Sequence, residues 1–182
     1  MKKLLISLAI VVATIQVAGQ SMEFFVNFSE KQAAPNFSFF SERRINDKFG
    51  YAFFSLVSES WAEAYVGPVY SPSSRISLYT FIGVETGGSH LRGSVGLWAD
   101  LGSSIHFLGF YEKGQGSDNY WYHGQVMRQS ERLNYGLMTR RFSGFGPRIE
   151  IPASKYFSFW LASLYDFEFS EIKGVCSVVL NF

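Results

Sequence analysis

The sequence predicts an all-β fold, a closed antiparallel transmembrane β-barrel of about twelve strands in one domain. Three observations lead to this prediction. From Gln20 onward, apolar residues alternate with small or polar ones at the two-residue period of strands, and no convincing helical period is found. Turn-forming residues interrupt this alternation roughly every 10 to 16 positions. In several segments one face of the alternation is apolar and the other carries the charges.

Composition narrows the class of protein. Aromatic residues make up 18% of the 182-residue chain, and charged residues make up only 17%, below the roughly 25% of an ordinary soluble domain. The formal net charge of +1 excludes a strongly basic nucleic-acid-binding protein, so nucleic acid is not an expected partner. Cys176 is the only cysteine, which excludes an intramolecular disulfide framework and a metal site built on several cysteines.

The first segment has the features of an export signal. Lys2 and Lys3 precede an apolar run over residues 4–13, and small residues at 17–19 offer a cleavage site before the strand array begins. A transmembrane helix is the alternative, but polar residues interrupt the run and no charged stop-transfer cluster follows it. We therefore expect a cleaved signal peptide over residues 1–19.

Residues 20–182 are expected to form the barrel, and each strand is bounded by turn residues. A ten-strand barrel is the alternative, if residues 36–43 or 145–151 form loops. The expected strands are 22–30, 36–43, 49–57, 61–70, 75–85, 91–100, 104–112, 119–128, 132–142, 145–151, 155–165 and 174–182.

Similar segments recur about 80 residues apart, in the same order along the chain. Residues 25–31 match residues 107–113, and Gly67-Pro68 matches Gly146-Pro147. Chance similarity between two aromatic-rich strand arrays is the alternative explanation. We expect two duplicated halves of six strands each, which favours a closed, pseudo-symmetric structure.

The two faces of the strands differ in polarity, which orients them. In residues 75–85 and 91–101 one face is apolar and the other carries polar and charged residues. A charge facing hydrocarbon is costly, so the charged face is expected to line the lumen. Residues 22–30 and 49–57 are apolar on both faces, and their alternation orients neither. The expected lumen-facing charges are Glu63, Arg75, Glu85, Arg92, Asp100, Arg140, Arg148 and Glu150.

These eight charges balance in sign, which favours ion pairs inside the barrel. The pairs either fill the lumen or narrow a water path through it. Glu150 and Arg140 lie on neighbouring expected strands, so Arg140 is the expected nearer partner of Glu150.

The final strand adds a resemblance to a known class. Counting back from the carboxyl end, alternate positions are occupied by Phe182, Leu180, Val178, Cys176 and Gly174. This pattern resembles the terminal strand of bacterial outer-membrane β-barrel proteins, which commonly ends in an aromatic residue. The resemblance implies a cleaved signal peptide, a location in the bacterial outer membrane, contact with outer-membrane lipid, and recognition of these five residues by the barrel-assembly machinery.

No catalytic, cofactor or metal site is expected. His90, His106 and His123 lie far apart in the sequence, which does not favour a metal site. The His-x-Ser pair of some outer-membrane lipid-modifying enzymes is missing, because Arg92, Leu108 and Gln125 stand two positions after the histidines. We expect a non-enzymatic barrel, either a narrow channel for small solutes or a structural or partner-binding barrel. The alternatives are a lipid-modifying enzyme and a soluble exported barrel that binds an apolar ligand, with its charges facing outward.

Overall fold

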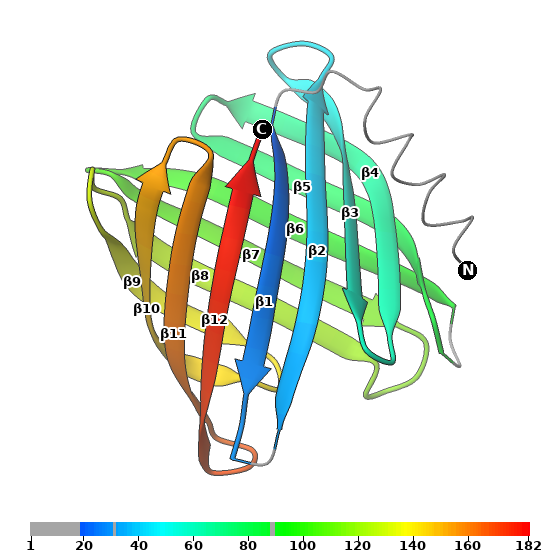
Figure 1. Cartoon of the computed structure of the whole chain (residues 1–182). Helices are drawn as coiled ribbons and strands as arrows, with labels where there is room; N and C mark the ends of the chain where they lie inside the picture. Colours follow the sequence, from blue (N-terminus) through cyan, green and yellow to red (C-terminus); the bar gives the residue numbers. More distant parts are fainter. Residues whose placement is uncertain (1–18, 31, 88–89) are drawn as a thin grey trace.

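Twelve antiparallel strands form a closed barrel in the computed structural model, which describes residues 19–30, 32–87 and 90–182 (Figure 1). The expected signal peptide lies outside these residues, apart from Gly19. The strands are β1 (Gln20–Phe28), β2 (Ala33–Arg44), β3 (Phe49–Ser58), β4 (Ala62–Ser73), β5 (Ile76–Glu85), β6 (Leu91–Gly102), β7 (Ile105–Gly114), β8 (Tyr120–Arg128), β9 (Asn134–Arg140), β10 (Gly144–Ser154), β11 (Phe157–Asp166) and β12 (Glu171–Asn181).

Each strand pairs with its neighbours in the sequence, and β1 pairs with β12 to close the sheet. At this seam the Phe182 backbone nitrogen donates to the Gln20 carbonyl oxygen at 3.0 Å. The predicted all-β, twelve-stranded fold is confirmed, and each expected strand overlaps an observed one. Residues 36–43 and 145–151 both lie within strands, so the ten-strand alternative is wrong. Among the described residues there is no helix long and apolar enough to cross a membrane.

The barrel has two ends, which we name by what lies there. At the terminus end, the start of β1 lies beside the C-terminus (Figure 1). The connections that follow β2, β4, β6, β8 and β10 lie at the same end. At the loop end lie the connections that follow β1, β3, β5, β7, β9 and β11.

The outer face of the barrel is apolar, as the alternation predicts. On β5, Ile82 and Val84 face outward with 59% and 56% of their surface exposed, whereas Tyr79 and Phe81 face inward and are buried. Exposed apolar and aromatic side chains recur on every strand around the barrel. A face of this kind is suited to hydrocarbon rather than to water.

The interior is packed with aromatic, apolar and charged side chains. One buried apolar cluster centres on Trp160, Met138 and Leu164, and a second centres on Tyr65 and Val69. On β1, which the sequence did not orient, Phe25 is buried inside the barrel and Phe24 is exposed outside. Side chains therefore occupy much of the lumen that any solute path would have to use.

Candidate functional site

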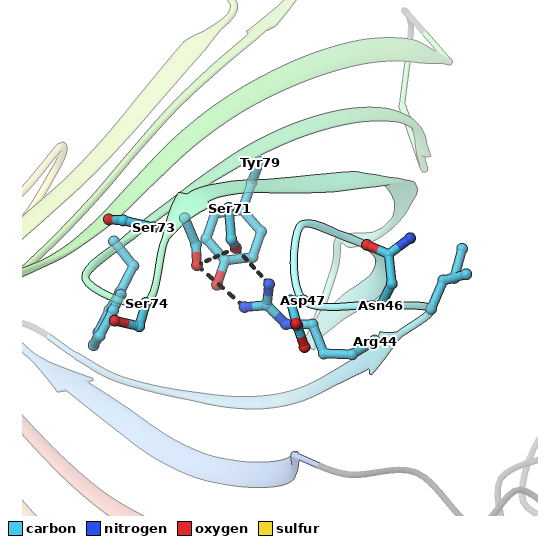
Figure 2. Close-up of a pocket in the computed structure, with 10 residues that line it drawn as sticks. Arg44, Asn46, Asp47, Ser71, Ser73, Ser74 and Tyr79 are labelled. Carbon is cyan, nitrogen blue, oxygen red and sulfur yellow. Dashed lines mark hydrogen bonds between the residues drawn. The ribbon is translucent and has the colours of Figure 1, made fainter.

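The lumen opens at the terminus end into a vestibule with a volume of about 570 Å³ (Figure 2). It is lined by the ends of β2, β4 and β6, by β5 and by two adjoining turns. Arg44, Ser71 and Ser77 supply polar groups to its wall, and Tyr79 and Trp98 supply aromatic rings. A space of this size and chemistry suits a small polar molecule with an apolar face.

Arg44 is held in place on the vestibule wall. Its Nη2 atom donates to Ser77 Oγ at 3.1 Å, and its Nη1 atom donates to Ser71 Oγ (Figure 2). Its Nε atom lies 2.6 Å from Glu42 Oε1, and the Tyr79 hydroxyl donates to the other oxygen of Glu42 at 3.0 Å. The guanidinium is thus neutralised by its own neighbour on β2, so the vestibule is polar without being strongly cationic.

A smaller cavity of about 150 Å³ shares Trp98 with the vestibule. It is lined by His106, Gln125 and Glu150, which project from β7, β8 and β10. His106 stacks on Trp98 with ring centroids 5.8 Å apart. The two cavities together mark the less densely filled part of the barrel, at its terminus end.

Aromatic rings close off the vestibule toward the loop end. Tyr79 stacks on Phe81 at 6.0 Å, and Phe110 lies 5.6 Å from Tyr79 and 6.3 Å from Phe81, all measured between ring centroids. Tyr65 adds a further ring, 6.4 Å from Phe81. These four rings come from β4, β5 and β7, so they reach inward from one side of the barrel.

Beyond the rings lies a group of buried charges that we call the Arg92 cluster: Arg92, Glu63, Glu85 and Glu112, with Tyr65 at their centre. The four charged side chains are only 4% to 7% exposed. Arg92 Nη1 lies 2.8 Å from Glu85 Oε2, whereas the other two carboxylates are farther from the guanidinium, at 3.8 Å for Glu63 and 3.6 Å for Glu112.

Glu85 is the best-satisfied carboxylate of the Arg92 cluster. Besides Arg92, it accepts hydrogen bonds from Trp61 Nε1 at 3.0 Å and from Asn119 Nδ2 at 2.8 Å. Asn119 also accepts from Arg92 Nη1 through its Oδ1 atom at 2.5 Å. Trp61 and Asn119 lie in loop-end connections, so these bonds tie the connections to the lumen.

A second group of charges lies on the opposite wall and is called the Arg148 cluster: Arg148, Glu150, Arg140 and Glu23. Arg148 Nη2 donates to Glu150 Oε2 at 2.8 Å, and Nη1 donates to Gln125 Oε1. The guanidinium also lies over the Trp160 ring at 4.2 Å. Glu23 accepts from Trp160 Nε1 at 2.6 Å and from Ser177 Oγ at 2.7 Å.

Arg140 has a different environment from Arg148. Its guanidinium lies 4.8 Å from the Phe25 ring and 5.9 Å from the Trp121 ring, and its side chain is buried. Among the described residues, its Nε atom and the Nε atom of Arg148 have no hydrogen-bond partner. Two buried guanidinium groups therefore keep unused donors inside the lumen.

The structure divides the eight expected lumen charges into three sets. Glu63, Glu85 and Arg92 join the Arg92 cluster, and Arg140, Arg148 and Glu150 join the Arg148 cluster. Asp100 is half-buried near the terminus end, where its carboxylate accepts from the Gly102 backbone nitrogen at 2.8 Å. Arg75 lies in the β4–β5 turn with an exposed side chain, because β5 begins one residue later than the sequence indicated.

The expected pairing of Glu150 with Arg140 differs from the pairing found. Glu150 pairs with Arg148, two positions along the same strand, because both side chains face inward from β10. Sequence reasoning considered only the neighbouring strand and overlooked this closer partner.

Several lumen-facing carboxylates were missed from the sequence, among them Glu112, Glu23 and Glu42. Glu112 lies in a strand whose two faces resemble one another, whereas Glu23 alternates with the apolar Met22 and Phe24, and this contrast was overlooked. In the structure Glu112 lies opposite Ser94, which the sequence had placed on the inward face of its strand. The strand register therefore carried the missing signal, and that register was not known from the sequence.

The histidines are not assembled into a reactive site. His90 is exposed in the β5–β6 connection, and its Nδ1 atom lies 3.3 Å from the Glu85 carbonyl oxygen. His106 and His123 lie inside the barrel and stack on Trp98 and Trp121. In the part of the chain that the structure describes, no three His, Cys, Asp or Glu side chains are placed to hold a metal ion.

Comparison with solved structures finds porins that share this fold. A KdgM porin has a TM-score of 0.60 at 12% sequence identity, with 89% of this chain and 99% of that chain aligned. A KdgM porin in complex with disordered oligogalacturonate has a TM-score of 0.62 at 12% identity and the same coverage. A NanC porin has a TM-score of 0.57 at 8% identity, covering 90% of this chain and 98% of that one.

No family model and no curated protein sequence matches the chain. At such low identities the structural likeness establishes the fold alone. The resemblance of the sequence to bacterial outer-membrane β-barrels is confirmed at the level of that fold.

Proposed function

We propose that the protein is an integral barrel of the bacterial outer membrane that conducts small polar solutes through a narrow lumen and has no catalytic role. The observation that carries the proposal is the polarity of the barrel: its exposed outer face is apolar, and its buried charges lie on the inner face among aromatic and apolar side chains. A soluble barrel that binds an apolar ligand would need the opposite arrangement. The vestibule of about 570 Å³ supplies an entrance to the lumen.

The biogenesis of the barrel forms part of the same proposal. A signal peptide over residues 1–19 would direct export, and outer-membrane lipid would surround the apolar face. We expect the assembly signal to comprise alternate residues of β12 and the residue that follows it, namely Gly174, Cys176, Val178, Leu180 and Phe182. Binding of a peptide with the sequence of residues 174–182 to the purified assembly machinery would test this signal.

The two arginines and two glutamates of the Arg148 cluster balance in charge, but the arginines keep donors for an anionic group of a small solute. Arg140 and Arg148 retain unused Nε donors, and buried guanidinium groups bind carboxylates strongly when they are desolvated. One of the structurally similar porins was solved in complex with oligogalacturonate, a carbohydrate that carries carboxylates. We therefore propose that Arg140 and Arg148 bind the anionic groups of solutes that pass through the channel.

Planar-bilayer recording tests this function. We expect a small conductance from the purified barrel, and the reversal potential measured across a salt gradient gives its ion preference. Arg140→Gln should shift the reversal potential toward cations, because it removes a positive charge from the lumen. Arg128→Gln is the matched control, since Arg128 is exposed at the end of β8. If the wild-type barrel conducts at no pH between mildly acidic and alkaline, the channel function is wrong and a structural role replaces it.

A further inference from the structure

The Tyr65 hydroxyl lies at the meeting point of three charged side chains. Arg92 Nε donates to it at 2.8 Å, and its oxygen lies 2.8 Å from Glu112 Oε2 and 3.0 Å from Glu63 Oε2. All three contacts are as short as ordinary hydrogen bonds. Tyr65 itself is only 2% exposed, so bulk water does not compete with these partners.

If Glu63 and Glu112 were both ionised, the three contacts of the Tyr65 hydroxyl would lack one proton. A tyrosine hydroxyl carries a single proton and can donate to only one carboxylate. If that proton is donated to Glu112, the closer of the two, the contact with Glu63 needs a proton on the Glu63 carboxyl. The hydroxyl oxygen then accepts from Glu63 and from Arg92 at once, which its two lone pairs allow.

Counting charges leads to the same result. The Arg92 cluster holds three carboxylates and one guanidinium, and the guanidinium pairs most closely with Glu85. Full ionisation would leave a net charge of −2, because the single guanidinium would be shared among three carboxylates, in a site that is 4% to 7% exposed. Isolated buried charges are strongly disfavoured, and two carboxyl groups in this situation retain one proton between them.

Among the described residues, the surrounding strands offer no further cation. From β3, the residues opposite Glu63 and Tyr65 are Leu56 and Phe54. From β6, Ser94 lies opposite Glu112, and from β8 Trp121 does so. From the adjoining connections come Trp61, Asn119 and the exposed His90, whose ring contacts only the backbone carbonyl of Glu85 among the cluster residues.

We propose that Glu63 and Glu112 share one titratable proton through the Tyr65 hydroxyl, and that this proton locks the loop end of the lumen. The stabilisation is present while the proton is bound, and it is lost as the pH rises and both carboxyls ionise. Repulsion between the two carboxylates would then loosen the contacts that tie Trp61 and Asn119 to the cluster. The effect on conductance rests on the proposed channel function, but the proton itself does not.

Infrared spectroscopy and thermal unfolding of the full barrel in lipid test the lock without any transport measurement. The wild type should show the carbonyl band of a protonated carboxyl group, and the band should be lost at alkaline pH. Its unfolding temperature should fall over the same pH interval. In Glu63→Gln the band should be absent and the fall in unfolding temperature should be lost, because the amide supplies the missing donor without titrating.

Two further variants keep the test decisive. Glu112→Gln should also remove the band, because Glu63 can then ionise and accept the Tyr65 proton; it serves if Glu63→Gln fails to assemble. Glu59→Gln, an exposed change in the β3–β4 connection, should leave the band and the pH response as in the wild type. A wild type without the band, or an unchanged band in both cluster variants, would overturn the shared proton.

Conductance separates this proposal from the proposed function. If the lock controls the channel, wild-type conductance should rise as the pH is raised through the interval in which the band is lost, and Glu63→Gln should abolish that rise. A band that titrates in a barrel that conducts at no pH supports the shared proton and overturns the channel function. If conductance does not change over the pH interval in which the band is lost, the lock is wrong and the channel function stands.

Discussion

Tyr65 is the residue on which the hydrogen bonds of the Arg92 cluster converge. One hydroxyl group holds a guanidinium and two carboxyl groups that belong to β6, β4 and β7. The ring beneath it packs against Phe54 and Phe81, so the same side chain joins the aromatic rings to the buried charges. A single residue thus connects the apolar and the charged parts of the lumen.

Replacing Tyr65 by Phe keeps the ring and removes the hydroxyl. Arg92 Nε and the two carboxyl groups then lose a partner inside the barrel, where water cannot easily replace it. We expect the free energy of unfolding to fall by about 1–3 kcal/mol, as is usual when a buried polar group is left unsatisfied. Unfolding in denaturant from lipid vesicles measures it.

Tyr111→Phe is the control for this change. Tyr111 is 47% exposed on the outer face of β7, so losing its hydroxyl should alter stability much less. Equal losses in the two variants would show that the hydroxyl of Tyr65 has no special role.

In two pairs of neighbouring strands, β4–β5 and β10–β11, the ladder of paired residues is interrupted at a Gly-Pro dipeptide. In β4–β5 the ladder passes from Val66 to Val69 without pairing Gly67 and Pro68, and in β10–β11 it passes from Phe145 to Arg148 across Gly146 and Pro147. Proline has no backbone donor for the ladder. These Gly-Pro pairs were matched in the predicted duplication, and β4 and β10 stand six strands apart. Because the interruption arises from the same dipeptides that were matched in the sequence, the duplication stays a prediction.

The glycine of each Gly-Pro dipeptide is required because the backbone of the neighbouring strand lies close to it. A Cβ atom at Gly67 would lie 1.9 Å from the Thr80 carbonyl oxygen, and one at Gly146 would lie 2.0 Å from the Ser163 carbonyl oxygen. Gly67→Ala should therefore force β4 and β5 apart and destabilise the barrel by about 1–3 kcal/mol, the usual cost of overpacking. The free energy of unfolding in lipid measures the effect.

Gly93→Ala is the matched control on β6. A Cβ atom there meets nothing closer than the Phe81 carbonyl oxygen at 3.8 Å, so this change should be neutral or slightly stabilising. If Gly67→Ala proves as harmless as Gly93→Ala, the close approach does not constrain the strand pair.

The sequence predicts a strand and its orientation most clearly where the two faces of the strand differ in polarity. In β5, apolar Ile82 and Val84 alternate with polar or aromatic inward residues, so the strand and its orientation were both predicted. In β3 the lumen side is itself apolar, because Ala52 packs inside, and alternation cannot separate two similar faces. In β1 the polar Glu23 and Asn27 share the inward face with Phe25, so the faces differ, and this contrast was overlooked in the sequence. Contacts between distant strands, such as Glu112 with Tyr65, depend on register and barrel closure, which single strands do not specify.

At the scale of the whole molecule, the barrel places its apolar surface outside and its charges inside. This arrangement predicts that the cost of a new charge on the outer face depends on its depth in the membrane. Val95→Arg, near the middle of β6, should destabilise the barrel by about 2–4 kcal/mol if the strand spans the bilayer. Folding equilibria into lipid vesicles give this number.

Leu101→Arg tests the dependence on depth within the same strand. Leu101 is 60% exposed on the outer face, similar to the 55% of Val95, but it lies at the terminus end of β6. Its substitution should cost only about 0–1 kcal/mol. Equal costs at the two positions, or a larger cost at Leu101, would contradict a membrane-spanning β6.

The side chains that fill the loop end of the lumen also determine how fast the proposed channel opens and closes. Most of the Arg92 cluster and the aromatic rings beside it are side chains carried by strands that are fixed in a closed sheet. An opening made by rotating such side chains needs no displacement of the backbone, so it should be much faster than the microsecond-to-millisecond motion of a whole domain. Current through a single barrel would then flicker rapidly and would rarely show the long, discrete closures of a moving plug.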